Sequence, residues 1–264
     1  MNDFEFHRPD SVAAAVAARK KAKEAKYLGG GQSLLPVMKL GLAAPPALVS
    51  VARLKELKGI RVEGKELVVG GAATHAEVAE SAEARKAIPA VADLAGHIGD
   101  AQVRNRGTIG GSLAHDDPAA DYPAAALALG ATIQTDRRAI PADQFFKGMF
   151  ETALQPDELI VAVRFPIPEK AAYAKFPHPA SRFALVGVFV AKGPAGVRAA
   201  VTGAAGSVFR SKELEAALSN KLAPDALDGV KVPSGGLTTD PFGSAEYRAH
   251  LVGVLARRAV EACK

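Results

Sequence analysis

The chain has 264 residues, of which 48% are hydrophobic and 23% are charged, and its formal net charge is +5 at pH 7. That length reaches the size at which a single hydrophobic core stops growing, so two or three compact units are expected. The basic residues are scattered along the chain and form no dense block, which argues against a nucleic-acid-binding protein.

Cysteine usage and hydropathy exclude further classes of protein. Cys263 is the only cysteine, so the chain forms no internal disulfide and cannot itself supply the thiolates of an iron–sulfur cluster. The six histidines lack the spacing of metal ligands, and no metal site is predicted. No apolar run reaches the roughly twenty residues of a membrane helix, and the N-terminus carries no export signal. We therefore expect a cytoplasmic protein.

The first half of the chain predicts alternating helices and strands. Asp10 and Ser11 are expected to cap a helix that reaches about Lys26, followed by a short strand at Tyr27 and Leu28. A second helix is expected to open at Ser33. A buried strand, a hairpin, a capped short helix and a longer helix are then expected at residues 47–51, 60–72, 74–80 and 84–99.

The second half continues this mixture. Pro118 is expected to begin a helix that ends near Leu129, and strands are expected at residues 131–135 and 159–165. Pro166 and Pro168 interrupt strand pairing, which predicts the main domain boundary near Glu169. An antiparallel set of strands at residues 173–176, 183–192 and 197–204 and helices at residues 212–219 and 245–262 are expected after it.

Two short glycine turns lie far apart in the sequence but share their chemistry. The first is Gly29-Gly30-Gly31-Gln32-Ser33 and the second is Thr108-Ile109-Gly110-Gly111-Ser112. Because glycine has no side chain, the backbone can approach an anion and its N–H groups can donate to phosphate oxygens. The hydroxyl groups of Ser33, Thr108 and Ser112 add further donors. Two such loops together fit a diphosphate, and therefore a dinucleotide.

The first loop leads from a strand into a helix, whose N-terminus favours phosphate. The alternative explanation is a tight turn closed by Ser33 as a helix N-cap. Neither loop has the G-x-G-x-x-G spacing of the Rossmann fold or the Gly-Lys pair of the P-loop. The sequence therefore predicts a different nucleotide-binding fold.

Five segments resemble the FAD-binding medium subunit of the molybdenum hydroxylases. That family contains the flavoprotein subunit of aerobic carbon monoxide dehydrogenase and the flavin domain of xanthine dehydrogenase. The segments are residues 29–36 (GGGQSLLP), 102–112 (QVRNRGTIGGS), 117–123 (DPAADYP), 157–166 (DELIVAVRFP) and 179–188 (PASRFALVGV). The resemblance runs essentially from end to end of the chain.

The resemblance implies an α+β fold with two parts. Residues 1–168 would form a FAD-binding domain of the vanillyl-alcohol-oxidase-like (PCMH) type, with subdomains at residues 1–54 and 55–168 and FAD between them. Residues 169–264 would form a smaller α+β C-terminal domain. Periodicity alone predicts only mixed α and β structure.

The resemblance also implies which residues bind FAD. Both glycine loops would hold the diphosphate, and Asp121 would accept hydrogen bonds from sugar hydroxyls. Asp117 is a weaker candidate, with helix capping as its alternative. Ile160 would make an apolar contact, and Tyr173 and Lys175 would lie near the flavin. The full set is Gly29, Gly30, Gly31, Gln32, Ser33, Thr108, Ile109, Gly110, Gly111, Ser112, Asp117, Asp121, Ile160, Tyr173 and Lys175.

One member of this set and four residues outside it receive separate interpretations. Gln32 stands where family members often have histidine, and an amide cannot take over a proton role from an imidazole. Arg104 and Arg106 could contact phosphate, but a structural role that holds the second loop is favoured for both. Phe145 and Phe146 are a place to look for exposed apolar surface that meets a partner.

The function implied by the resemblance is electron transfer. FAD on this chain would receive electrons from a small subunit with [2Fe-2S] clusters, which collects them from a large subunit with the molybdenum cofactor. The family commonly assembles as a dimer of heterotrimers, and no catalytic residue is expected on this chain. Two alternatives stay open: a free-standing flavin oxidase or dehydrogenase, and a non-catalytic module that binds another diphosphate.

Overall fold

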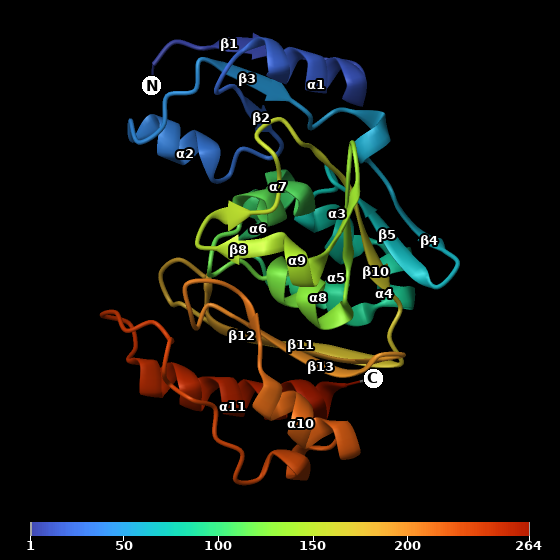
Figure 1. The fold of residues 1–264 in the computed structure, drawn as a ribbon, viewed down its shortest axis with the longest axis vertical. Coiled ribbons are helices and arrows are strands. Elements are labelled where there is room, and N and C mark those ends of the chain that lie inside the picture. The colour runs from blue at the N-terminus through green and yellow to red at the C-terminus, as the bar shows by residue number, and fades with distance from the viewer. Residues whose placement is uncertain (1, 264) are drawn as a thin grey trace.

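Three layers are stacked along the long axis in the computed structural model, which describes residues 2–263 (Figure 1). The N-terminal layer is a parallel three-stranded sheet in the order β1 (Glu5–His7), β3 (Ala47–Ser50) and β2 (Lys26–Leu28). Helices α1 (Val12–Lys21) and α2 (Leu34–Lys39) pack around it. Helix α1 ends at Lys21 and not near Lys26 as predicted, because residues 22–25 turn to bring Ala25 into the core.

The middle layer is a five-stranded antiparallel sheet backed by helices. Its strand order is β4 (Ile60–Glu63), β5 (Glu66–Gly70), β10 (Ile160–Pro166), β6 (Thr132–Thr135) and β7 (Ala139–Pro141). The helices are α3 (His75–Glu80), α4 (Ala82–Ala87), α5 (Pro89–Gly96), α6 (Ala101–Arg106), α7 (Ile109–His115), α8 (Tyr122–Leu129) and α9 (Ala142–Phe145). A short 3-10 helix η1 (Lys55–Leu57) precedes the sheet, and the hairpin of β8 (Phe146–Gly148) and β9 (Glu151–Thr152) lies at its edge.

Two predicted helices of this layer differ in the structure. The helix expected at residues 84–99 is divided at Ile88, whose backbone leaves the helical region because Pro89 follows it and begins α5. The helix expected from Pro118 begins only at Tyr122. Residues 118–121 form a turn instead, since the Thr202 hydroxyl donates to the Ala120 carbonyl at 2.6 Å and the Gly203 amide donates to the Pro118 carbonyl at 2.8 Å.

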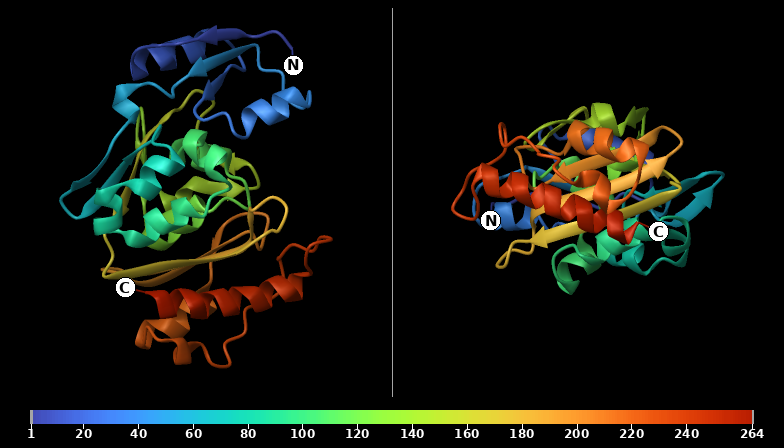
Figure 2. Two further views of the ribbon diagram at one scale, coloured as in Figure 1. Left: turned by 180° about the vertical axis from the view of Figure 1, so that it is seen from behind. Right: turned by 90° about the horizontal axis from the view of Figure 1, so that it is seen from below.

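The third layer is an antiparallel sheet with helices on its outer face. Its strand order is β11 (Lys170–Pro177), β12 (Ala184–Gly193), β13 (Gly196–Thr202) and β14 (Phe209–Arg210). Helix α10 (Lys212–Asn220), the 3-10 helix η2 (Pro224–Leu227) and the long helix α11 (Ala245–Ala262) follow. Seen from behind and from below, α11 runs across the face of this sheet that points away from the middle layer (Figure 2).

The sheet β11–β14 contributes to two hydrophobic cores. On β12, Val186, Val188 and Val190 pack with the side chains of α10 and α11. Phe189 and Ala191, on the opposite face of the strand, pack with the core of residues 67–165. The apolar interior is therefore continuous across the domain boundary predicted near Glu169, and that boundary stays a prediction.

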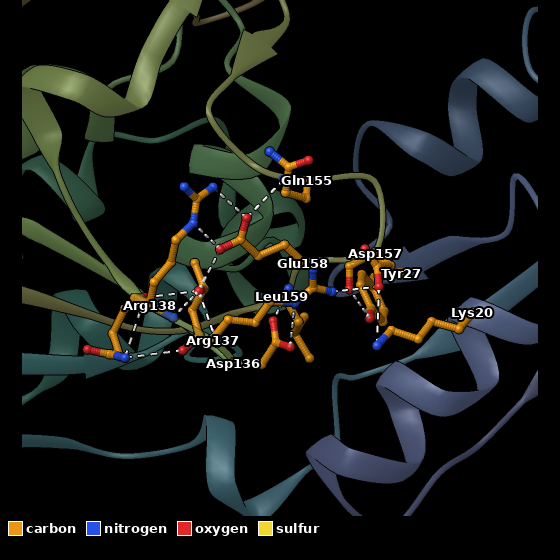
Figure 3. A network of polar contacts seen from close by, with 11 residues as sticks. Lys20, Tyr27, Asp136, Arg137, Arg138, Gln155, Asp157, Glu158 and Leu159 are labelled. Atoms are coloured by element: carbon orange, nitrogen blue, oxygen red, sulfur yellow. Dashed lines mark hydrogen bonds and ion pairs between the residues drawn. The ribbon is translucent and has the colours of Figure 1, made fainter.

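A polar network joins the N-terminal layer to the middle layer (Figure 3). The Asp157 carboxylate lies 2.6 Å from Arg137 Nη2 and 3.6 Å from Lys20 Nζ, and its carbonyl accepts from the Tyr27 hydroxyl at 2.9 Å. Next to it, the buried Glu158 accepts from Arg138 Nε at 2.8 Å and Nη2 at 2.9 Å. The network fixes the position of β2, which leads directly into the first glycine loop, relative to the middle layer.

Glu158 should contribute pH-dependent stability. The Arg138 guanidinium and the other donors lower the pKa of Glu158 from 4.5 to about 2. The contribution is therefore fully present above the pKa of an unfolded glutamate and is lost as the pH falls through about 2. We expect Glu158→Gln to lower the free energy of unfolding by about 2 kcal/mol at pH 7. Denaturant titrations of both proteins between pH 7 and pH 2 measure this difference, which should shrink as the pH falls.

The matched control is Glu169→Gln. Glu169 pairs with Lys192 at 2.9 Å, but both side chains are exposed, so this change should cost less than about 1 kcal/mol. A difference between wild type and Glu158→Gln that stays constant down to pH 2 would contradict the assigned role of the Glu158 charge.

Candidate dinucleotide site

The structure brings the two glycine loops into direct contact. A Cβ atom built on Gly29 would lie 2.9 Å from Thr108 Oγ1, and one on Gly30 would lie 2.6 Å from Gly107 Cα and overlap the Arg106 carbonyl oxygen. Only glycine therefore allows this approach of the two backbones at Gly30.

The first loop presents a run of unpaired donors. Within the described chain, no backbone amide from Gly29 to Leu34 donates to another residue, and the next amide, that of Leu35, donates to the Gly31 carbonyl at 3.1 Å. Gly31 has a φ of +73°, which favours glycine. Ser33 occupies the N-cap position of α2, but its hydroxyl makes no capping hydrogen bond. The loop thus fits an anion better than it fits the simple N-cap explanation.

The second loop is built differently, because four of its five amides, those from Ile109 to Ser112, are bonded within the protein. The amides of Ile109 and Gly110 donate to the carbonyls of Ala73 at 3.1 Å and Gly71 at 3.0 Å. The Gly111 amide donates to Thr108 Oγ1 at 3.1 Å, and the Ser112 amide donates to the Thr108 carbonyl. These four amides hold the loop and the start of α7 in position, so the second loop supports the first loop more than it contacts a phosphate.

A stack of backbone segments lies behind the second loop. A Cβ on Gly110 would lie 3.1 Å from the carbonyl carbon of Gly71, and one on Gly71 would lie 3.2 Å from the carbonyl carbon of Ile160. The Gly71 amide donates to the Val161 carbonyl at 2.7 Å. The side chain of Ile160 is buried in the core of the middle layer, and its backbone contacts Gly71, which in turn contacts Gly110 of the second loop.

Asp121, Tyr173 and Lys175 form one buried cluster. The Tyr173 hydroxyl donates to Asp121 Oδ1 at 2.5 Å, and Lys175 Nζ lies 3.0 Å from the same carboxylate and donates to the His97 carbonyl at 3.1 Å. Asp121 lies at the N-cap position of α8 without a capping hydrogen bond, and not inside a helix as predicted. Its carboxylate oxygens thus accept from side chains of β11.

Burial governs the electrostatics of this cluster. It raises the pKa of Asp121, and the Lys175 ammonium and the Tyr173 hydroxyl act in the opposite direction. Burial and the Asp121 charge raise the pKa of Tyr173 well above its usual value. The charges of Asp121 and Lys175 oppose each other within the cluster, which joins the start of α8 to the third layer.

The candidates beside the second loop have local partners of their own. Asp117 Oδ1 accepts from the Ala119 amide at 2.8 Å, so its carboxylate does cap the turn that follows it. Arg104 Nη1 donates to the carbonyls of Ile98 at 3.2 Å and Gly99 at 3.4 Å, which agrees with its predicted structural role. Gln32 is exposed at the tip of the first loop.

His75 is a residue of this region that sequence reasoning missed. It follows Thr74, the cap of α3, and a Cβ on Gly107 would lie 2.5 Å from its Nε2 atom. Burial and the charge of Arg104 lower the pKa of His75 to about 4. The only sequence signal near His75 is the capping box at Thr74. It predicts the start of a helix, but it does not predict that His75 contacts the residue before the second loop.

Three buried polar atoms near the second loop lack a hydrogen-bond partner in the described chain: His75 Nδ1, Asp116 Oδ2 and the Tyr122 hydroxyl. The rings of His75 and Tyr122 lie 5.4 Å apart. Burial, with the neighbouring charge of Asp117, raises the pKa of Asp116 to about 7.

Other predicted features concern absences and exposed surface. Residues 2–263 contain no group of three His, Cys, Asp or Glu side chains arranged to hold a metal ion, and none of their helices is long and apolar enough to cross a membrane.

Phe145 is fully buried and Phe146 is half-buried, contrary to the expectation of exposed apolar surface there. The exposed apolar side chains of that hairpin are Met149 and Phe150.

Comparison with known proteins identifies close relatives. Residues 2–168 match the family described as "FAD binding domain in molybdopterin dehydrogenase". The chain is 35% identical to the carbon monoxide dehydrogenase medium chain of Hydrogenophaga pseudoflava, over 98% of this chain and 96% of the relative. It is also 35% identical to the nicotine 6-hydroxylase medium subunit of Paenarthrobacter nicotinovorans, over 97% of this chain and 95% of the relative.

Solved structures share the whole fold. A chain of the reconstituted CO dehydrogenase from Oligotropha carboxidovorans superimposes with a TM-score of 0.91 at 32% identity, covering 98% of this chain and 97% of that one. A chain of quinoline 2-oxidoreductase from Pseudomonas putida 86 gives a TM-score of 0.89 at 26% identity, with 99% and 96% covered. The α+β fold predicted from the sequence is confirmed by these similarities.

Proposed function

Because this chain belongs to the family of FAD-binding domains of molybdopterin dehydrogenases, we propose that it is the electron-transfer flavoprotein subunit of a molybdenum hydroxylase. The observation that carries the proposal is the contact between the two glycine loops, one of which keeps a run of amides, from Gly29 to Leu34, free of protein acceptors. Such a run fits the diphosphate of FAD.

Different residues of the site would have different roles in binding FAD. Gly29, Gly30, Gly31, Gln32 and Ser33 would hold the diphosphate, with the hydroxyl of Ser112 beside them. A second group of residues would hold the two loops in their relative positions: Thr108, Ile109, Gly110, Gly111 and Ile160. Asp117 would fix the turn that leads to Asp121, whose bonds to Tyr173 and Lys175 would orient an aromatic ring and a cation toward the flavin.

FAD, when bound, supplies the electron chemistry, because it accepts electrons from a donor and passes them to an acceptor. The chain's own residues bind and orient it, and none is proposed as a general acid or base. Since Cys263 is the only cysteine, iron–sulfur clusters would belong to another subunit.

The proposed partners are a small subunit with [2Fe-2S] clusters and a large subunit with the molybdenum cofactor, assembled as a dimer of heterotrimers. Support comes from relatives that are named as medium chains or medium subunits and that match almost the full length of this chain. We propose that the complex works in the cytoplasm, a reducing compartment compatible with a chain that has a single cysteine.

The purified full-length chain tests the proposal. After incubation with FAD and removal of free flavin, it should retain about one FAD per chain, seen in the visible absorbance spectrum, and it should oxidise no substrate alone. Purification of the tagged chain from its native cells should recover two further subunits, identified by mass spectrometry. A colourless chain would contradict FAD binding, whereas turnover by the isolated chain would favour a free-standing flavin enzyme.

A further inference from the structure

The first loop supplies donors but no positive charge. Its unpaired amides run from Gly29 to Leu34, and no lysine or arginine occurs between Gly29 and Met38. The amides of the second loop from Ile109 to Ser112 are already bonded within the protein. A cation from elsewhere in the fold would therefore strengthen the binding of a negatively charged diphosphate at the first loop.

Arg106 is a basic residue whose backbone contacts the first loop. Its carbonyl oxygen occupies the space where a side chain at Gly30 would begin, so its backbone touches the middle of the first loop. The following residue, Gly107, is held on its other side by His75, whose Nε2 would be 2.5 Å from a Cβ there. The backbone of residues 106 and 107 is thus in contact with both the first loop and His75.

The ordinary explanation for arginines at this point is a structural one, in which the guanidinium donates to nearby backbone carbonyls, and it applies to Arg104 only. Both arginines lie in the last turn of α6. Arg104 donates to the carbonyls of Ile98 and Gly99. The exposed side chain of Arg106 makes neither a hydrogen bond nor an ion pair with any residue between 2 and 263.

We propose that Arg106 binds the FAD diphosphate, as the cation that complements the amides of the first loop. This inference rests on the proposed FAD-binding function and corrects the structural role expected for Arg106 from the sequence. A guanidinium suits the task because its planar set of donors can bond two phosphate oxygens at once. Arg104 is then the structural member of the pair.

The test measures the dissociation constants of FAD and of riboflavin, which lacks phosphate, for the full-length chain. We expect Arg106→Gln to weaken FAD binding about tenfold to a hundredfold, which is the loss of one or two charged hydrogen bonds, and to leave riboflavin binding unchanged. The affinity of the variant for FAD should also depend less on salt concentration, because one ionic contact is gone.

Arg258→Gln is the matched control, because Arg258 is an exposed arginine on α11, away from both loops, with no ion pair in the described chain. It should bind FAD like wild type. Arg106→Lys keeps the charge but loses the paired donors, so its affinity should lie between those of wild type and Arg106→Gln. This second variant also serves if Arg106→Gln fails to fold.

The outcomes separate two kinds of failure. If wild type binds neither FAD nor riboflavin, the proposed function fails. If wild type binds FAD and the Arg106 variants bind it equally well, only the role of Arg106 is overturned. Equal losses of FAD and riboflavin affinity would also overturn it, since they would mean that Arg106 supports the loop.

Discussion

Replacing Gly30 by valine should strongly weaken FAD binding. The new Cβ would overlap the Arg106 carbonyl and lie 2.6 Å from Gly107 Cα, so the two loops would have to separate. Overpacking of this kind costs about 1–3 kcal/mol, and it acts here at the point where the loops meet. We expect the affinity for FAD to fall by about tenfold to a hundredfold, measured by equilibrium dialysis against FAD.

Gly253→Ala is the matched control for a glycine substitution. Gly253 lies within α11, and a Cβ built there meets no atom within 4 Å. Alanine should therefore raise the free energy of unfolding by about 0.5–1 kcal/mol and leave FAD binding unchanged. Undiminished FAD binding by Gly30→Val would show that the contact between the loops is not needed for the site.

Replacing Asp121 by asparagine should be the most destabilising single change at the site. It would leave the Lys175 ammonium, whose side chain is only 4% exposed, without its counter-charge. Removing one partner of a buried ion pair costs about 3–5 kcal/mol, because the other charge stays buried. Urea unfolding of the flavin-free chain measures the loss, and the variant should also lose FAD as Tyr173 and Lys175 move.

The double variant Asp121→Asn with Lys175→Met tests the physical cause. Because methionine carries no charge, the second change should recover much of the lost stability but not FAD binding. Asp225→Asn is the control, since Asp225 and Lys221 form an exposed pair that is worth less than about 1 kcal/mol. A loss below about 1 kcal/mol for Asp121→Asn would contradict a charged, tightly paired cluster.

Elements encoded by local signals were predictable from the sequence. Ser11 and Thr74 cap their helices through their hydroxyl groups, and the hairpin of β4 and β5 turns at Gly64, whose φ is +61°. These interactions span only a few residues, so the sequence pattern contains all the partners. The antiparallel set β11–β13 was likewise predicted, because its long apolar strands are separated by short turns.

Elements that depend on distant partners were not predictable. Pro118 is a good first residue for a helix, but the amide of Gly203, which follows β13, donates to the Pro118 carbonyl and delays the helix to Tyr122. The amides of the second loop are bonded to Gly71 and Ala73, which no local pattern connects to it. The family resemblance thus predicts which residues form the site, but the sequence does not show which of their donors are free.

The sheet that serves two cores limits how the chain can be divided. Phe189 and Ala191 complete the interior beneath α8, while Tyr173 and Lys175 on the adjacent strand reach Asp121. Residues 2–168 therefore cannot complete their hydrophobic core without strands of the third layer. A chain cut at residue 168 would lose both the cover of its apolar interior and the two side chains that bond to the Asp121 carboxylate, so an engineered exchange of this part should retain strands β11 to β13.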